Sequence, residues 1–366
     1  MHSAPNIANL LPSGLMDSLP PLAAQEFKLI HRFLKLAMGF GYAPVHPPLL
    51  EFADTLLSGQ GEATSHHSFQ VLDPLSNRML ALRADITTQL SRIAAGSLNA
   101  APRPLRLCYA GYSVRTLPEA LAIRRQHLQL GLEQIGAPEL IADAEMIALS
   151  CHLLKQYPIG ALTVDITYPS LLPALLHDIA EEHHAAIKQA VANKDSAALG
   201  QLGAPILADI LSASGAYAQS IPALRAIAHP ALHAALDAIE GVVARLNQTK
   251  SEISLVIDLL ETGGYGYYSG IAYALYASNP ALLLARGGRY ESQGETAVGI
   301  TYYLQELVPH LPAETEAPLL AVPHTLSFAE AETLQAKGYR TVLIEEGAAA
   351  PSGVGLKYSN GKISEA

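Results

Sequence analysis

Hydrophobic residues recur along the chain with two different periods, which predict helices and strands. Residues 18–42 carry apolar side chains at helical spacing until Gly39 breaks the pattern, so an amphipathic helix is expected here. Residues 142–156 predict a second helix, and residues 160–169 predict a strand. The expected apolar face of the first helix comprises Phe27, Ile30, Phe33, Leu34, Ala37 and Met38.

Prolines and turn residues divide the strands expected between residues 43 and 85. Residues 43–52 predict a strand interrupted by Pro47 and Pro48, a combination that is confined to sheet edges or bulges. Residues 69–83 predict a hairpin that turns at residues 73–76, and helix signals follow from Ile86 through Ala94. The carboxylate of residue 85 thus lies where strand gives way to helix, and N-capping would explain it without any function.

The most informative pattern runs from Arg103 to Gly136, where two strands are expected to be joined by an open loop. Period-2 geometry places Gln129, Gly131 and Glu133 on one face of the second strand, because alternate side chains share a face. Glycine would let a small ligand approach the backbone between an amide and a carboxylate. An ordinary hairpin with one wet face is the alternative for any single residue. The face expected on the first strand comprises Leu105, Leu107, Tyr109, Gly111, Ser113 and Arg115.

The second half of the chain alternates helical and extended patterns. Residues 171–247 are rich in alanine and broken by glycine and proline, which predicts several short helices. A short buried strand and a glycine- and tyrosine-rich segment follow in residues 253–277, then a strand at residues 282–286 that ends before Gly287. From Ala317 a strand, a helix and a strand are expected, with a loop and a short hairpin in the tail.

Composition narrows the functional classes. A chain of 366 residues is long enough for two or three domains. The net charge of −10, from 23 Lys plus Arg against 33 Asp plus Glu, argues against a general nucleic-acid surface. No run of about eighteen apolar residues occurs, so neither a membrane segment nor membrane binding is expected. Two cysteines, Cys108 and Cys151, are too few for a disulfide framework and are expected in the core of a cytoplasmic protein.

Adjacent histidines at positions 183 and 184, beside Glu181 and Glu182, invite a metal interpretation. Helical metal ligands are normally three or four residues apart, whereas adjacent side chains diverge, so solvated histidines are favoured. The pair at positions 66 and 67 is interpreted in the same way. No metal and no cofactor are therefore predicted.

Several segments, in family order, resemble histidyl-tRNA synthetases over most of the chain. The hairpin is similar to motif 2 of that family, with Arg115 at the strand end and the pattern Gln129-x-Gly131-x-Glu133. Five motifs in order are far more specific than one. The other similar segments are residues 41–52 (motif 1), 82–93 (the segment that binds the amino group of histidine), 267–270, and 287–291 with 297–300 (toward motif 3).

The resemblance implies an α+β fold, namely a class II aminoacyl-tRNA synthetase-like antiparallel sheet flanked by helices. It implies a first part of this core in residues 1–170 and a second part in residues 249–315. A helical insertion is expected in residues 171–248, and a small C-terminal α/β unit in residues 316–366. These roughly fifty final residues are too few for the anticodon-binding domain of the synthetases.

Three departures from the synthetase motifs remove charged residues that contact the substrate carboxylate or the nucleotide phosphates in that family. Gly263 stands where the family has the arginine of Arg-Gly-Leu-Asp, with residues 264–266 completing the altered motif. Residues 303–306 end in glutamate where the family has Gly-Leu-Glu-Arg, and residues 115–118 lack the Arg-x-Glu-Arg pattern. Adenylate formation depends on cations that stabilise phosphates, so loss of aminoacylation is expected. With residues 84–93, these departures resemble the histidyl-tRNA synthetase-like regulatory subunits of ATP phosphoribosyltransferase.

That resemblance implies a non-catalytic, allosteric subunit required for the first step of histidine biosynthesis and mediating feedback inhibition by histidine. The implied partner is a short-form ATP phosphoribosyltransferase catalytic subunit, in a hetero-octamer of four plus four, with a homodimer formed through the motif 1 region. In the implied site, Asp85, Thr87 and Gln129 receive the α-ammonium group of histidine, and Glu133 with Tyr268 holds its ring. The full implied histidine-binding set is Asp85, Thr87, Arg115, Gln129, Glu133, Tyr267 and Tyr268.

Alternatives stay open at this point. A divergent histidyl-tRNA synthetase would need the two missing arginines, and a scaffold that never binds histidine would not need Gln129 and Glu133. Histidine could also bind at an intersubunit boundary. Because Gly263 replaces the arginine that contacts the substrate carboxylate, Arg115 or backbone amides would have to compensate.

Overall fold

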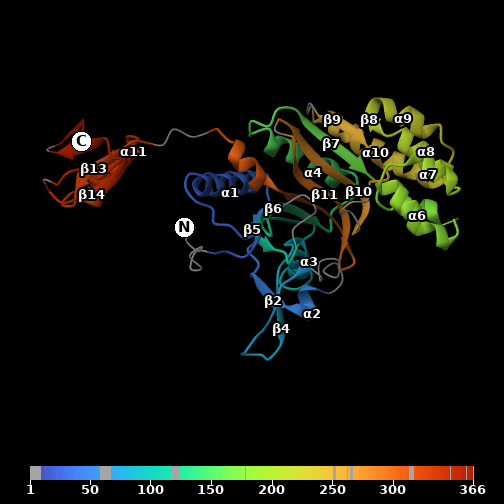
Figure 1. The fold of residues 1–366 in the computed structure, drawn as a ribbon, viewed down its shortest axis with the longest axis horizontal. Coiled ribbons are helices and arrows are strands. Elements are labelled where there is room, and N and C mark those ends of the chain that lie inside the picture. The colour runs from blue at the N-terminus through green and yellow to red at the C-terminus, as the bar shows by residue number, and fades with distance from the viewer. Residues whose placement is uncertain are drawn as a thin grey trace, which may run out of the picture. The chain divides into compact units, whose positions relative to one another are not determined.

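The computed structural model describes residues 10–57, 67–117, 124–177, 179–249, 253–261, 263, 267–279, 281–312, 317–346, 348–359 and 361–365. They belong to two compact units, Met1–Leu311 and Pro312–Ala366 (Figure 1). Within the described residues, no helix combines the length and apolarity needed to cross a membrane.

The larger unit is built on a nine-stranded sheet in the order β1-β5-β6-β12-β11-β10-β7-β9-β8. All neighbours from β5 to β7 in this order are antiparallel, whereas β1 with β5 and β7 with β9 are parallel. The expected antiparallel, helix-flanked sheet is thus confirmed. Its strands are β1 (Ala43–Pro44), β5 (Leu105–Val114), β6 (Gln126–Ile135), β7 (Leu162–Thr167), β8 (Gly215–Ala216), β9 (Ser254–Ile257), β10 (Tyr268–Ser278), β11 (Ala281–Ser292) and β12 (Glu295–Tyr302).

The main core lies on one face of this sheet, under α1 (Leu22–Gly39), α4 (Ile141–Leu154) and α10 (Pro230–Gln248) (Figure 1). Leu130 and Leu132 of β6 pack there with Phe33 of α1. Successive side chains of a strand point to opposite faces of the sheet, so these leucines face away from the side that carries Gln129 and Glu133. Both cysteines are buried and unpaired in this core, as expected. Smaller helices follow β7: α5 (Leu171–Leu176), α6 (Glu181–Ala192), α7 (Ser196–Gln201), α8 (Pro205–Ser212) and α9 (Tyr217–Arg225), and η3 (Leu304–His310) is a 3-10 helix.

One detail of the helix predictions is wrong. The buried residues of the first helix form one narrow stripe, which consists of Glu26, Leu29, Phe33 and Ala37. Phe27 lies outside this stripe and is 70% exposed. Met38, also expected on the apolar face, is 48% exposed. The several short helices expected after residue 170 are present as α5 to α9, and α10 is longer, with 19 residues.

The opposite face of the sheet carries α3 (Thr87–Ala95) and a smaller sheet of β2 (Leu50–Phe52), β4 (Met79–Leu82) and β3 (Gln70–Leu72), with α2 (Ala53–Leu56) alongside. The hairpin predicted around residues 73–76 is confirmed, since the Asp73 carboxylate accepts hydrogen bonds from the backbone nitrogens of Leu75 (3.1 Å) and Ser76 (3.2 Å). In contrast, the strand expected to end at Arg286 continues to Ser292, because Gly287 and Gly288 pair with β12.

The smaller unit contains the predicted strand, helix and strand, followed by the predicted hairpin. Its four-stranded sheet has the order β14-β13-β15-β16, with Leu320 and Val322 of β13 packing on Leu334 of α11. Ser327 begins this helix by accepting a hydrogen bond from the Glu330 backbone nitrogen. The elements are β13 (Leu319–Pro323), α11 (Phe328–Ala336), β14 (Arg340–Ile344), β15 (Leu356–Ser359) and β16 (Lys362–Glu365).

Candidate functional site

The register of β5 and β6 builds the wall expected from the sequence. Gly111 pairs with Gln129, and Leu107 pairs with Glu133, so the predicted sharing of one face is confirmed. This is the face covered by α3, where Leu107 packs in a small apolar cluster with Ile86. Gln129 and Glu133 are each only 1% exposed.

Gly131 does not leave an open gap for a ligand, contrary to expectation. Tyr109 pairs with it across the strands, and a Cβ atom at residue 131 would lie 2.1 Å from Tyr109 Cζ. The tyrosine hydroxyl forms a 3.0 Å hydrogen bond with Thr301 Oγ1 on β12. The glycine therefore makes room for a tyrosine ring of this chain.

Asp85, Thr87 and Gln129 form one polar cluster at the start of α3. Asp85 Oδ1 accepts a hydrogen bond from the Thr87 backbone nitrogen (2.7 Å), and Oδ2 accepts one from Gln129 Nε2 (3.1 Å). Gln129 Oε1 in turn accepts from the Ile86 backbone nitrogen (3.1 Å). Asp85 is not the N-cap of α3, contrary to the capping interpretation, because Ile86 occupies that position and makes no side-chain cap hydrogen bond. From one residue earlier, Asp85 contacts the first turn of the helix and also reaches the strand residue assigned to the same site.

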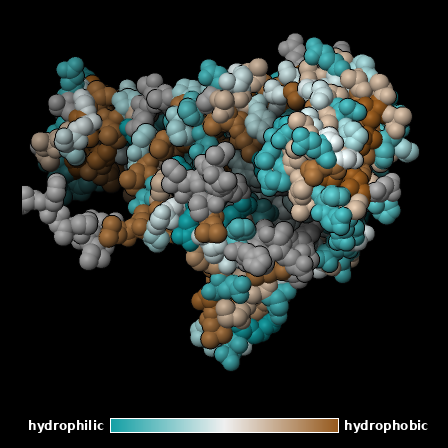
Figure 2. All heavy atoms as spheres, turned by 45° about the vertical axis from the view of Figure 1, so that its right-hand side comes forward, coloured by the Kyte–Doolittle hydropathy of each residue, from teal (hydrophilic) through white to brown (hydrophobic). Residues whose placement is uncertain are grey.

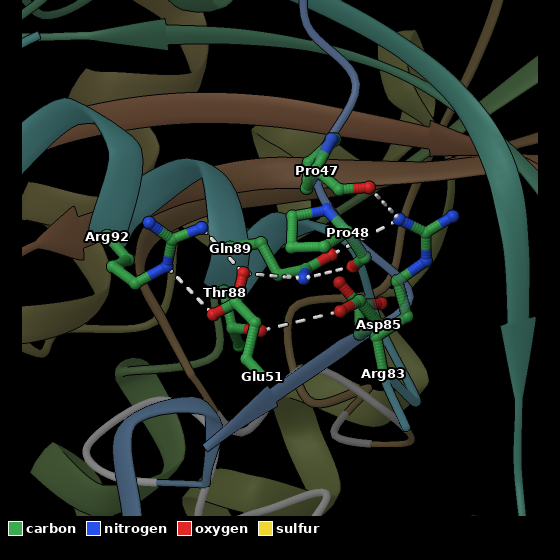
Figure 3. A network of polar contacts seen from close by, with 8 residues as sticks. All are labelled: Pro47, Pro48, Glu51, Arg83, Asp85, Thr88, Gln89 and Arg92. Carbon is green, nitrogen blue, oxygen red and sulfur yellow. Dashed lines mark hydrogen bonds and ion pairs between the residues drawn. The ribbon is translucent and has the colours of Figure 1, made fainter. Parts of the chain in front are cut away.

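A second polar network fixes α3 from its outer side, where Figure 3 shows Gln89 and Arg92 reaching Glu51 of β2. Gln89 Nε2 donates to Glu51 Oε1 (2.7 Å) and to the Pro48 carbonyl oxygen (2.8 Å). Arg92 Nε donates to Glu51 Oε2 (2.8 Å). These contacts orient the helix that carries Thr87, a supporting shell that the sequence patterns did not indicate.

Glu133 is the most perturbed carboxyl group of the site. Burial raises its pKa to about 8, with the nearby Asp85 charge adding to the shift and the Tyr290 hydrogen bond opposing it. Tyr290 Oη donates to Glu133 Oε2 (2.7 Å), and Gly299 leaves room for the carboxyl, since a Cβ atom there would lie 1.8 Å from Oε2. The raised pKa favours the protonated form of this carboxyl group at neutral pH.

The sequence patterns missed Tyr290 and Gly299 as members of the site. Tyr290 lies in a segment expected to follow a strand, so its face could not be assigned. With β11 extending to Ser292, Tyr290 pairs with Tyr268, and both join the cluster on the α3 face. The repeated Gly-Gly before Arg289 was the available signal, because glycines in a strand mark a close approach.

Tyr267 and Tyr268 contact each other at the start of β10, and Tyr268 belongs to the apolar cluster on the α3 face. Tyr267 Oη donates to Tyr268 Oη (2.7 Å), and their ring centroids lie 4.1 Å apart. Tyr268 is 9% exposed, whereas Tyr267 is 41% exposed.

The remaining predicted positions lie around this cluster. Arg115 follows β5, and its Nε donates to the carbonyl oxygen of Ala84 (3.4 Å), one residue before Asp85. Glu306 of η3 forms an ion pair with Arg124 (3.6 Å), which precedes β6. Residues 118 and 264–266 of the altered motifs, and His66, lie outside the described residues.

Histidine pairs offer no metal site in the part of the chain that the structure describes. His184 Nε2 contacts the carbonyl oxygens of Leu176 (3.0 Å) and Ile179 (2.8 Å), while His183 is exposed. In the same residues, no group of three His, Cys, Asp or Glu side chains is arranged to hold a metal ion.

Comparison with known proteins gives consistent matches along the chain. The family model of histidyl-tRNA synthetase matches residues 14–307. The ATP phosphoribosyltransferase regulatory subunit of Rhodospirillum centenum is 35% identical and aligns with 99% of this chain and 97% of its own length. The regulatory subunit of Paramagnetospirillum magneticum is 37% identical, covering 91% of this chain and 90% of its own.

Solved structures match the fold. A Bacillus halodurans protein described as an ATP phosphoribosyltransferase regulatory subunit/histidyl-tRNA synthetase has a TM-score of 0.81, with 24% identity over 95% of this chain and 96% of its own. A chain of the Thermotoga maritima ATP phosphoribosyl transferase (HisG:HisZ) complex has a TM-score of 0.62, with 21% identity over 76% of this chain and 97% of its own. At these identities the structures establish the fold alone.

Proposed function

The chain belongs to the family of ATP phosphoribosyltransferase regulatory subunits, which has the histidyl-tRNA synthetase fold, and from this membership we propose that it activates a short-form catalytic subunit and senses histidine. As a regulatory subunit, it is not itself the catalytic subunit of ATP phosphoribosyltransferase.

The observation that supports the histidine proposal is the cluster of hydrogen-bonded polar side chains between α3, β6 and β11, which we propose as the histidine pocket. Asp85 and Gln129 are linked by a hydrogen bond, and Glu133 is linked to Tyr290. The Asp85 carboxylate suits an α-ammonium group, and a carboxyl group beside phenols suits an imidazole ring, which can both donate and accept. We assign the ammonium to Asp85, Thr87 and Gln129, and the ring to Glu133 and Tyr268.

The charges around the pocket favour sensing over adenylation. Gly263 offers no cation where the synthetases have an arginine, and Glu306 brings an anion that engages Arg124. Transfer of an adenylyl group needs positive charge at the phosphates in the transition state. The retained amino-acid pocket and the altered phosphate positions together fit a subunit that binds histidine without activating it.

Partners and cellular setting are part of the proposal. β1 pairs with β5 at the edge of the main sheet and is exposed, which supports a homodimer through residues 41–52. We propose a hetero-octamer of four regulatory and four catalytic chains in the cytoplasm. Within each regulatory chain, we propose that residues 171–248 are an insertion between the two parts of the core, residues 1–170 and 249–315, and that residues 316–366 are a separate domain.

Calorimetry on the Asp85→Ala/Glu133→Ala double variant tests the pocket assignment. We expect histidine affinity to fall roughly 100-fold, because each change removes a hydrogen-bonding group from the site. Contacts to the Asp85 carboxylate are worth about 1.5–3 kcal/mol, and a hydrogen bond to the neutral Glu133 carboxyl group is worth about 0.5–1.5 kcal/mol. The control is Asp17→Ala/Glu332→Ala, which removes two exposed acidic groups and should bind like the unaltered chain. Unchanged affinity in the pocket variant would place histidine elsewhere.

A further inference from the structure

The carboxylate of a bound amino acid needs a cation, and the position that supplies it in the synthetases is Gly263 in this chain. Gly263 lines a cavity of about 190 Å³. The other lining residues are Asp165, Thr167, Glu261, Tyr276 and Arg286, so Arg286 is the cation among them. Arg286 lies on β11, so a guanidinium group from another part of the chain lines the same cavity as Gly263, the position where the synthetases have an arginine.

Strand register places Arg286 on the same sheet face as the proposed histidine pocket. Arg286 pairs with Thr301 of β12, Thr301 pairs with Gly131 of β6, and Gly131 pairs with Tyr109 of β5. Residues that pair directly across antiparallel strands point to the same face. Arg286 is therefore the next side chain beyond Thr301, whose hydroxyl already bonds Tyr109.

A second row of paired residues joins the pocket to the cavity. Glu133 pairs with Gly299, Gly299 with Gly288, Gly288 with Ala272, and Ala272 with Thr167 of the cavity wall. In this row, only two glycines and one alanine lie between Glu133 of the proposed histidine pocket and Thr167 of the cavity. A small ligand held by Glu133 thus lies on a sheet surface that leads toward the cavity without a large side chain in the row.

The Glu261 carboxylate leaves little room for a side chain at residue 263. The Gly263 backbone nitrogen donates to Glu261 Oε1 (2.7 Å), and a Cβ atom at residue 263 would lie 2.8 Å from that same oxygen. An arginine at this position would have to displace the Glu261 carboxylate. The cavity accommodates Arg286 in its place.

We propose that Arg286 on β11 holds the α-carboxylate of the amino acid bound in the pocket and so replaces the guanidinium lost at position 263. The assignment rests on the proposed function, because it presumes that histidine occupies the pocket. Guanidinium groups bind carboxylates through two parallel hydrogen bonds, which makes them selective for that planar group. With Arg286 in this role, the site distinguishes amino acids from the corresponding amines.

Titration calorimetry with histidine and histamine tests this role, because histamine keeps the ring and the ammonium group but lacks the carboxylate. The unaltered chain should bind histidine at least 10-fold more tightly than histamine. In Arg286→Gln, histidine affinity should fall about 10- to 100-fold, while histamine affinity should stay within about twofold. Arg286→Lys should recover part of the preference, and Arg78→Gln, which alters an exposed ion pair, should change neither affinity.

These measurements distinguish a failure of the Arg286 assignment from a failure of the proposed histidine sensing. If the Gln and Lys variants, shown to be folded by thermal melts, still prefer histidine as strongly as the unaltered chain, another group holds the carboxylate and the Arg286 assignment is wrong. An equal loss for both ligands would overturn it too, since that result indicates a general effect on the pocket. If the unaltered chain binds neither ligand, the proposed histidine sensing fails, whatever Arg286 does.

Discussion

Replacement of Asp143 by alanine is expected to lower the free energy of unfolding by about 3–5 kcal/mol, because it leaves a buried guanidinium group without its partner. Asp143 of α4 forms an ion pair with Arg289 of β11 (2.6 Å), and their side chains are only 2% and 8% exposed. Asp143 also accepts a hydrogen bond from the Leu140 backbone nitrogen at the start of the helix (2.9 Å). Urea unfolding of the isolated chain measures the change.

The double variant Asp143→Ala/Arg289→Met is the informative control. Removing both charges should restore a large part of the lost stability, because apolar replacements of a buried ion pair are often well tolerated. Breaking the exposed pair of Asp54 and Arg78 with Asp54→Ala should have little effect. If Asp143→Ala is also nearly neutral, the Arg289 pair does not hold α4 against the sheet.

Glu133→Gln is expected to stabilise the free chain progressively as the pH rises. The folded-state pKa of Glu133 is raised to about 8, against 4.5 for an ordinary glutamate, mainly by burial. At low pH both the folded and the unfolded chain hold the proton, so there is no cost. Between these two pKa values only the unfolded chain releases it, so the unaltered protein loses stability with increasing pH.

The gain from Glu133→Gln should therefore grow from pH 4.5 and level off above pH 8, at several kcal/mol. Glutamine remains uncharged and can still accept the hydrogen bond from Tyr290. Urea unfolding of both proteins across this pH range gives the difference directly. A difference that does not change with pH would mean that Glu133 ionises normally in the folded chain.

Local patterns in the sequence predicted the parts of the fold that depend on near neighbours. The period-2 pattern placed Gln129 and Glu133 on one face because β6 is regular, and the turn at Asp73 followed from its side-chain chemistry. Helix boundaries near Thr87 and Ile141 were found within one residue.

The features that were missed depend on segments far apart in the sequence. Tyr290 reaches Glu133 from 157 residues away, and its face depends on how far β11 continues. Gly131 was interpreted as a gap because the ring that fills it comes from the paired residue Tyr109. The exposure of Phe27 follows from a buried stripe that includes Glu26, which hydrophobicity alone does not predict.

The surface of the larger unit carries exposed apolar side chains. Brown patches in Figure 2 mark apolar residues that the fold leaves exposed. On the hairpin of β3 and β4, Leu72 is 54% exposed and Leu75 at the turn is 96% exposed. Alternation along a strand predicts which residues share a face, but the layer that covers that face is set by the rest of the fold.

Regulation of a catalytic subunit through the residues around Glu133 is tested most directly by mixing the chain with a short-form catalytic subunit and measuring the formation of phosphoribosyl-ATP with and without histidine. We predict that the unaltered chain activates the transferase and confers inhibition by histidine, and that Asp85→Ala/Glu133→Ala still activates it but no longer confers inhibition. Failure of the chain to activate, or equal inhibition with both proteins, would contradict the account.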